Sequence, residues 1–392
     1  MNATPALRPM PRQVDIDSLA AFDEHARMAL DRPPGKYHAS MRGWHVQSVD
    51  LRHRAGMLEL LDPAGSVFLG CELKPASAQL LSHGGALIFP EIPGIPFDMY
   101  RPELYSGPEL FAGIPTKGYE QTPDARIYAW SHHRLGAGAH DSLNAALATT
   151  LHDHAIGSAL ESALESGALS ENPVVGLMGG HAQERGTAGF RNAALLGRAL
   201  ARAGFTVATG GGPGAMEAAN LGAYLSAHPD AALDSALGQL AGAPSFTPSV
   251  TVWARLAMDV LARFPGGAVN LGIPTWSYGH EPPNLFATHI AKYFANAIRE
   301  AVLLEKCTGG IVFMPGAAGT VQEVFQDACE NYYGVPGTIT PMVLVGVEHW
   351  TRTLPAWPLL RALAAGRGLE AHIHLVDDAA EAVAVISREA GR

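Results

Sequence analysis

The residues with the clearest chemical potential are glycines gathered in three short segments of the second half of the chain. These segments are residues 179–181, 210–217 and 315–320, with the sequences GGH, GGGPGAME and PGAAGT. Glycine lets a backbone approach a phosphate closely, and a helix that follows such a loop offers unpaired N–H groups and the positive end of its dipole. If the three loops meet at one edge of a sheet, they would suit a phosphorylated ligand.

The residues that we expect to bind this ligand all belong to the three segments. They are Gly179, Gly180, His181, Gly210, Gly211, Gly212, Gly214, Met216, Glu217, Pro315, Gly316, Ala317, Ala318, Gly319 and Thr320. One glycine turn after a strand is more often a tight connection than a binding site, so the expectation rests on the three together. The P-loop pattern G-x-x-x-x-G-K-[ST] is absent, and residues 210–212 lack the spacing of a dinucleotide fingerprint.

Thr320 and Glu323 have two interpretations. Thr-x-x-Glu is a capping box, in which both side chains satisfy backbone donors at the start of a helix. Alternatively, Glu323 is a carboxylate in the first helical turn, beside the glycine-lined pocket. The spacing favours neither interpretation. Glu217 can likewise cap its helix or contact a ribose, and His181 can be a solvated loop residue.

Short β-branched runs alternate with longer helical patterns from about residue 173 onward. This order predicts a doubly wound, Rossmann-like parallel sheet with helices on both faces, of the α/β class. We expect strands at 174–178, 205–208, 310–314, 342–347 and 372–376, and helices at 189–203, 214–227, 285–305, 320–333, 356–365 and 378–389. In such a sheet, ligands bind where strands end and loops enter the next helices.

The helix expected at 285–305 would stack three polar side chains on one face. Lys292, Asn296 and Arg299 are four and three residues apart, which is the spacing of neighbours on a helix surface. The stripe can be part of the ligand site or a contact between subunits. An exposed position is the usual one for an arginine such as Arg299.

The first part of the chain has a different sequence pattern, in which Pro-Gly dipeptides interrupt short apolar runs. Strands at 67–71 and 86–89, with a helix at 76–82 between them, predict a smaller α/β domain. We therefore expect an N-terminal α/β domain of unknown role at 1–140, a helical connector at 141–172 and the Rossmann-like domain at 173–392. No internal repeat is evident.

Composition and charge exclude several classes of protein. With 47% hydrophobic and 16% charged residues in 392, the chain is too apolar for a disordered polymer, yet it has no run of about 18 apolar residues to span a membrane. A net charge of −10 argues against a polynucleotide partner. Three scattered cysteines and an N-terminus without a secretory pattern favour the cytoplasm. No histidine spacing is typical of a metal site, so we expect neither metal nor cofactor.

Five segments together resemble the LOG family of phosphoribohydrolases, whose signature is PGGxGTxxE. They are the glycine segments 210–217 and 315–323, Met178–His181 with the sequence MGGH, residues 281–284 with the sequence EPPN, and residues 376–381. The resemblance covers about residues 172–386. Within the family, the chain is most similar to bacterial pyrimidine/purine nucleotide 5′-monophosphate nucleosidases.

The resemblance implies roles for individual residues. Glu323 matches the catalytic glutamate of the signature, and Arg299 is the best match to the essential arginine of the family. The loop at 316–320 would hold the 5′-phosphate, with 210–214 on the ribose side. Ala317 stands where the signature has its second glycine, at a cost of about 1 kcal/mol if that position needs a positive φ. The family's sites lie at a dimer interface, which implies a homodimer or higher homo-oligomer.

The resemblance implies hydrolysis of a nucleoside 5′-monophosphate to free base and ribose 5-phosphate. Because the reaction passes through an oxocarbenium-like ribosyl cation, we expect Glu323 to stabilise that cation and to deprotonate the attacking water, while Arg299 orients Glu323 or binds phosphate. The alternative is a non-catalytic nucleotide sensor on the same fold, which Ala317 makes credible. A pyridoxal-phosphate decarboxylase is disfavoured because no glycine loop contains a lysine.

Overall fold

The computed structural model describes residues 14–31, 39–133, 143–169, 171–277 and 281–391. The chain divides into two compact units, Met1–Pro102 with Ser142–Ala155, and Glu103–Asp141 with Ile156–Arg392. This division differs from the segments expected from the sequence, because Glu103–Asp141 belongs with the second unit and the helix α7 (Leu143–Glu165) contributes to both. Residues 1–13, which bear on the expected absence of a secretory pattern, lie outside the described part.

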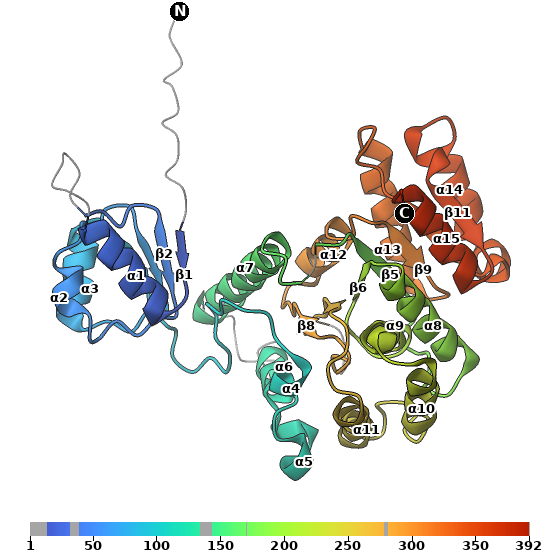
Figure 1. Cartoon of the computed structure of the whole chain (residues 1–392), viewed down its shortest axis with the longest axis horizontal. Helices are drawn as coiled ribbons and strands as arrows, with labels where there is room; N and C mark the ends of the chain where they lie inside the picture. Colours follow the sequence, from blue (N-terminus) through green and yellow to red (C-terminus); the bar gives the residue numbers. More distant parts are fainter. Residues whose placement is uncertain (1–13, 32–38, 134–142, 170, 278–280, 392) are drawn as a thin grey trace, which may run out of the picture. The chain divides into compact units, whose positions relative to one another are not determined.

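The first unit contains a four-stranded parallel sheet with the order β1-β2-β3-β4. Its elements are β1 (Val14–Ile16), α1 (Leu19–Leu30), β2 (Trp44–Gln47), α2 (Ala55–Leu58), β3 (Val67–Leu69), α3 (Pro75–His83) and β4 (Leu87–Phe89). The strands and the helix predicted in this region are thus confirmed as β3, β4 and α3. The helices lie along one side of the strands (Figure 1) and enclose a core that includes Phe22, Trp44 and Phe68.

These elements form a repeat that the sequence did not reveal. Gly43, Gly65 and Gly85 precede successive strands, and each has a positive φ, of 84°, 78° and 92°. The N–H of Gly43 donates to the carbonyl of Gly65 at 2.9 Å, and the N–H of Gly65 donates to that of Gly85 at 3.3 Å. The glycines are therefore stacked in register, as in the coils of a solenoid, where each repeat contacts only its neighbours.

The second unit contains a seven-stranded sheet with the order β11-β10-β9-β5-β6-β7-β8, and every pair in it is parallel. The strands are β5 (Val174–Met178), β6 (Thr206–Thr209), β7 (Leu271–Gly272), β8 (His289–Ile290), β9 (Ile311–Phe313), β10 (Met342–Val345) and β11 (Ile373–Val376). All five strands predicted for this region are confirmed. Each of the five lies within about one or two residues of its expected position, and β7 and β8 were not foreseen.

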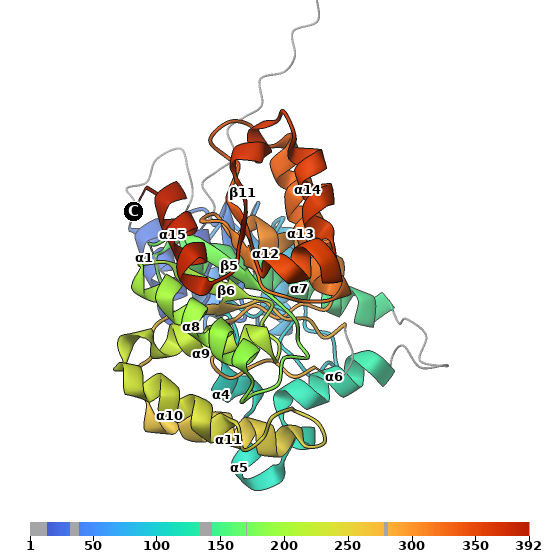
Figure 2. The ribbon, with the colours of Figure 1, turned by 90° about the vertical axis from the view of Figure 1, so that its right-hand side faces the viewer.

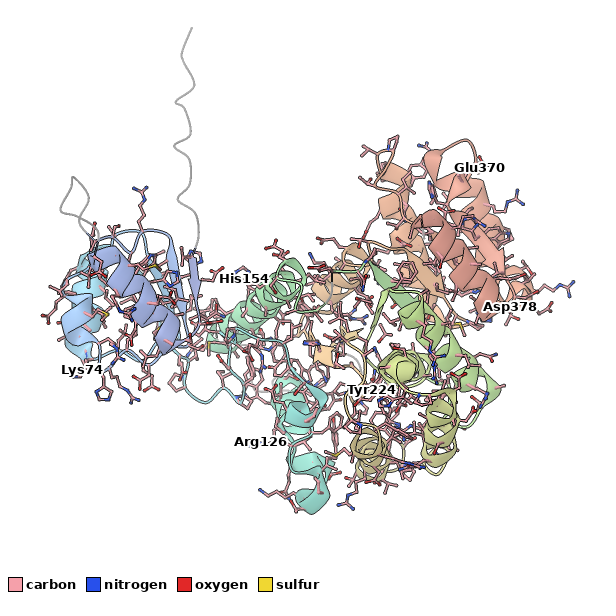
Figure 3. The ribbon with its side chains drawn as sticks, viewed as in Figure 1. Lys74, Arg126, His154, Tyr224, Glu370 and Asp378 are labelled. Carbon is pink, nitrogen blue, oxygen red and sulfur yellow. The ribbon has the colours of Figure 1, made fainter. Side chains whose placement is uncertain are left out.

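The second unit also contains a set of α-helices. They are α4 (Gly107–Leu110), α5 (Ile114–Lys117), α6 (Pro123–His133), α8 (Ala188–Arg202), α9 (Ala215–Tyr224), α10 (Asp230–Leu240), α11 (Val250–Arg263), α12 (Asn296–Glu305), α13 (Ala318–Tyr333), α14 (Ala356–Ala364) and α15 (Ala379–Glu389). Figures 1 and 2 show α8, α9 and α15 side by side, while α13 packs against α12 and α14. Tyr224 at the end of α9 donates a hydrogen bond to the carbonyl of Phe264, and Asp378 caps α15 (Figure 3).

The strand order reverses beside β5, which fixes where a ligand can bind. From β5 the chain proceeds to β6, β7 and β8 on one side, and it then returns to β9 on the other. Loops that leave β5 and β9 therefore diverge to opposite faces and open a crevice at their carboxyl ends. The predicted fold class, a doubly wound α/β sheet with a smaller α/β domain, is confirmed.

The helix predicted at 285–305 is wrong in its first half. Residues 289–290 form β8, which pairs with β7, and α12 begins only at Asn296. The N–H of Ala291 donates to the carbonyl of Gly272 at 2.9 Å, so sheet pairing overrides the helical spacing of the apolar residues. Lys292 consequently does not share a helix face with Asn296 and Arg299.

Lys292 instead forms a fully buried ion pair with Asp124. Its Nζ lies 2.6 Å from Asp124 Oδ1, and both side chains are 1% exposed. Asp124 also accepts hydrogen bonds from the hydroxyl of Tyr119 at 2.7 Å and from the indole of Trp276 at 3.0 Å. Burial lowers the pKa of Lys292, while the Asp124 carboxylate opposes that effect. The pair ties the segment around α6 to the strands β7 and β8.

Neither a membrane span nor a metal cluster emerges from the described residues. Within that part of the chain, no helix has the length and apolar character needed to cross a bilayer. The same residues hold no group of three or more His, Cys, Asp or Glu side chains arranged for a metal ion. Among the histidines, His152 is buried on α7, where its ring packs against the ring of Phe97.

We expect Lys292→Met to destabilise the protein by about 3–5 kcal/mol, because it leaves the Asp124 carboxylate buried without its cation. The double variant Lys292→Met/Asp124→Asn should recover part of this loss. As a control, Arg191→Ala breaks an exposed pair with Asp234 and should cost less than about 1 kcal/mol. Urea unfolding monitored by tryptophan fluorescence measures all three. Equal midpoints for Lys292→Met and Arg191→Ala would contradict this account.

Candidate active site

A cavity of about 810 Å³ lies at the carboxyl ends of β5, β6 and β9, where the crevice is expected. Fourteen of the seventeen predicted site residues line it. These are Gly179, Gly180, His181, Gly210, Gly212, Met216, Arg299, Pro315, Gly316, Ala317, Ala318, Gly319, Thr320 and Glu323. Gly211, Gly214 and Glu217 do not line the cavity. The three glycine loops therefore converge, as their sequence positions indicate.

Gly180 joins the three loops through its backbone. Its N–H donates to the carbonyl of Pro315 at 3.4 Å, and its carbonyl accepts from the N–H of Ala215 at 3.1 Å. Gly214 has a φ of 75°, and a Cβ there would lie 2.6 Å from the Gly180 carbonyl oxygen. Gly214 thus serves the close approach of two loops, although it does not line the cavity.

The loop after β9 does not form the capping box that Thr320 and Glu323 suggest. Helix α13 begins at Ala318 with Ala317 as its N-cap, and no described side chain caps it. Thr320 is 5% exposed, and its hydroxyl lies where a Cβ on Gly316 would be. Only glycine therefore fits at position 316. The first N–H groups of α13 are left without a side-chain cap among the described residues, beside the cavity.

Ala317 causes no backbone strain. Its φ is −114°, a value that any L-residue adopts, so the methyl group meets no conformational penalty of the kind that a positive φ would impose. The energetic cost expected for alanine at position 317 applied only if φ there were positive, and φ is negative. The substitution of the signature glycine gives no reason to regard this loop as damaged.

Buried amides hold the loop after β6. Asn220, Asn270 and Asn284 are each 0% exposed. The Nδ2 of Asn284 donates to the carbonyl of Gly212 at 3.1 Å and to Asn220 Oδ1 at 2.9 Å, and the Nδ2 of Asn220 donates to Asn270 Oδ1 at 2.8 Å. The N–H of Asn284 also donates to the carbonyl of Gly211 at 2.8 Å. This amide network fixes a glycine loop that has no side chains of its own.

Glu217, expected to cap its helix or to contact a ribose, forms a buried ion pair and does not line the cavity. Both oxygens accept from Arg185 Nε at 3.1 Å, and each partner's side chain is 1% exposed. Arg185 also donates to the carbonyl of Trp253 at 3.0 Å and lies 4.6 Å from that ring centroid. The pair anchors the loop after β5 to α9 and α11.

Arg299 lies between two carboxylates in the wall of the cavity. It contacts Glu300 at two points, Nη2 to Oε1 at 3.0 Å and Nη1 to Oε2 at 3.2 Å. Glu323 is farther away, with 3.9 Å between its Oε1 and Arg299 Nη1. The side chains of Arg299, Glu300 and Glu323 are 9%, 6% and 13% exposed. The exposed-surface interpretation of Arg299 is therefore wrong.

The Glu323 carboxyl group has a raised pKa. Burial is the main cause, the Glu300 carboxylate adds to it, and the Arg299 guanidinium opposes both, so that the pKa of Glu323 rises from 4.5 to about 8. One turn further along α13, burial also raises the pKa of Asp327 well above its ordinary value. Burial therefore favours the protonated form of the Glu323 carboxyl near neutral pH.

Two nitrogens in this region are left for a ligand or an ordered water. Arg299 Nε and His349 Nε2 are buried, and neither finds a hydrogen-bond partner among the described residues. His349 opens a π-helical turn, η3 (His349–Thr353), after β10 and lines the cavity. Two further lining residues lie close together, with 3.7 Å between His181 Nδ1 and Glu281 Oε1. Buried polar atoms that lack partners are rare in folded proteins and call for a ligand or a water.

Several lining residues were not singled out from the sequence as site residues. They are Ala182, Gln183, Pro274, Thr275, Glu281, Glu300, Gln322 and His349. Two signals were available, since His349 follows a strand end and Glu300 adjoins the predicted arginine. No local pattern marks Pro274 and Thr275, because they follow the two-residue strand β7.

Comparisons with known proteins give matches in structure alone. No family model matches the chain, and no curated protein matches it. Solved structures that match include the molybdenum cofactor binding protein of Rippkaea orientalis and the molybdenum cofactor carrier protein of Chlamydomonas reinhardtii. Each is 16% identical, with a TM-score of 0.34, over 56% of this chain and 98% and 100% of theirs. A third, TM1055, is 21% identical, with a TM-score of 0.36, over 55% and 99%. These values concern the fold and carry no information on ligand or activity.

The raised pKa of Glu323 predicts a pH-dependent cost in stability. Between about 4.5 and about 8, the folded protein holds a proton that the unfolded chain has released, so stability falls as the pH rises through this range. Glu323→Gln should remove part of this fall, because an amide does not ionise, and Asp327 should account for part of the remainder. Urea midpoints measured on both sides of the range test this. Glu348→Gln, at an exposed site, should leave the slope unchanged. A slope equally steep in Glu323→Gln would contradict the prediction.

Proposed function

We propose that this protein is a nucleoside 5′-monophosphate phosphoribohydrolase, which hydrolyses the N-glycosidic bond to free base and ribose 5-phosphate. The observation that carries the proposal is the position of Glu323. Its carboxyl group lies in the same cavity as the glycine loop 315–320, in the second turn of the helix that this loop begins. A phosphate at the loop and a reacting carbon near Glu323 would be the two ends of one ribose 5-phosphate.

The phosphate site that we propose depends on the backbone. The uncapped N-terminus of the sixteen-residue α13 offers N–H groups and a dipole that favours a dianion. Gly316 and Gly319 keep this entrance free of side chains, and Arg299 is the cation that lines the same cavity. The cavity of about 810 Å³ falls within the range typical of small-molecule sites.

The carboxylates favour a ligand that develops positive charge. Glu281, Glu300 and Glu323 line the cavity together. Cleavage of an N-glycosidic bond gives the ribosyl group oxocarbenium character, which nearby negative charge stabilises, whereas a neutral base must leave with a proton. A site with one ionised carboxylate and one protonated carboxyl can serve both needs.

Incubation with a panel of nucleoside 5′-monophosphates, with chromatography of the released base, tests the proposal. We expect release from at least one member. Glu323→Gln should lower kcat/KM by at least about 100-fold, since it removes the acid–base group. Binding measured by calorimetry should persist, because a protonated carboxyl and an amide are alike in shape and charge. Binding without release from any member would favour the non-catalytic sensor. Retained turnover in Glu323→Gln would overturn the role of Glu323.

Ala317→Gly tests whether the missing signature glycine impairs the enzyme. Because φ at this position is −114°, the change should alter kcat/KM by less than about threefold. The measurement is the same base-release assay, with the wild type as reference. A large gain in rate would show that the methyl group of Ala317 obstructs the ligand, contrary to this expectation.

A further inference from the structure

The carboxyl groups of Glu300 and Glu323 flank Arg299, and they contact its guanidinium group in different ways. Resting on the proposed function, we propose that Glu300 is a positioning residue that keeps Arg299 paired, so that Glu323 enters the reaction as the proton donor to the departing base. This adds proton donation to the departing base to the deprotonation of water that the sequence analysis expected of Glu323.

The geometry assigns the guanidinium to Glu300. Two nitrogen–oxygen contacts, at 3.0 and 3.2 Å, join Arg299 to Glu300, and Asn296 adds to the cluster. Its Oδ1 accepts from Arg299 Nη2 at 3.2 Å, and its Nδ2 donates to Glu300 Oε1 at 3.4 Å. The distance of 3.9 Å between Arg299 and Glu323 exceeds hydrogen-bonding range. Glu323 therefore receives only the weaker share of the positive charge.

The balance of charge decides which carboxyl keeps a proton. One cation and two acids lie in a wall where all three side chains are less than 15% exposed. After Glu300 has neutralised Arg299, a second carboxylate there would lack a compensating charge in a medium of low dielectric constant. The carboxyl without the two-point contact, Glu323, is accordingly the one that stays protonated.

The other titratable groups around Glu323 do not reverse this balance. On its own helix lies Asp327, whose buried carboxyl also holds its proton tightly. Cys307, just after α12, is a buried thiol whose pKa is raised by burial and by the acids of α13. Glu281 and His181, which are 3.7 Å apart, also line the cavity, as does His349 in the turn after β10. In the described part of the chain, Arg299 is the one lysine or arginine that lines the cavity.

The proposed step balances in protons and electrons. As the bond from C1′ to the base nitrogen breaks, its electron pair goes to the base, and the Glu323 carboxyl donates its proton to a basic atom of that base. Water then forms the new bond to C1′ and gives its proton to the Glu323 carboxylate, which restores the acid. Glu300 exchanges no proton in this step and stays paired with Arg299.

Glu300→Gln tests the proposal, because it removes the competing charge while it keeps the shape of the side chain. Arg299 should then turn its charge to Glu323 and lower the pKa of that carboxyl. We expect the alkaline limb of kcat/KM, where activity is lost as Glu323 ionises, to move to lower pH by about one unit or more, with little change in KM. Glu300→Asp, which keeps the charge, should restore a limb near that of the wild type. Glu305→Gln, on the exposed side of the same helix, should not move it.

Carbon NMR titration of the labelled glutamate carboxyls gives a readout that does not depend on turnover. Comparison with Glu323→Gln assigns the Glu323 signal, whose midpoint should fall in Glu300→Gln. An unchanged midpoint would overturn the positioning role of Glu300. A wild-type rate that rises through the midpoint of Glu323 would overturn its role as proton donor. If the midpoint falls but no nucleotide releases a base, the proposed function fails while the pairing of the three side chains stands.

Discussion

The cavity depends on a set of buried amides that lie outside it. A glycine loop has no side chains with which to hold its own shape, so its conformation must be imposed by hydrogen bonds from neighbouring segments. Asn284 supplies two of these bonds to the loop after β6, and Asn220 and Asn270 hold Asn284 in turn. Because all three amides are fully buried, each lost bond would leave a polar group without a partner, which makes the network cooperative.

The same constraint explains why the fold was easier to predict than the site. The strands and helices around β5, β6, β9, β10 and β11 follow from local patterns, namely β-branched runs, glycine turns and helical spacing. The amide network joins residues far apart in the chain, and no spacing rule connects Asn220 to Asn284. The helix predicted over residues 285–295 was wrong for a related reason. The two-residue strand β8 pairs there with β7, and strands this short leave no periodic pattern in the sequence. The repeat of the first unit consists of backbone hydrogen bonds and glycine conformations, which a pattern of side chains in the sequence does not reveal.

The start of α13 shows how one local pattern can serve two purposes. Thr-x-x-Glu at a helix start ordinarily satisfies the first N–H groups of that helix. Here the N-cap is Ala317, three residues before Thr320, so Thr320 packs against Gly316 and Glu323 faces Arg299. The helix end is left open toward the cavity, and the carboxyl group is free to take part in chemistry. The absence of a side-chain cap, among the described residues, at the start of α13 is thus what supports the phosphate site that we propose there.

The stacked coils of the first unit have a consequence for how this protein can vary in evolution. In a stack where each coil bonds only to the next, through glycines such as Gly43, Gly65 and Gly85, the gain or loss of one whole coil leaves the register of the others intact. The doubly wound sheet has no such freedom, because its crevice exists only where β5 and β9 are neighbours. Relatives of this chain should therefore differ in the length of the first unit far more readily than in the strand order of the second.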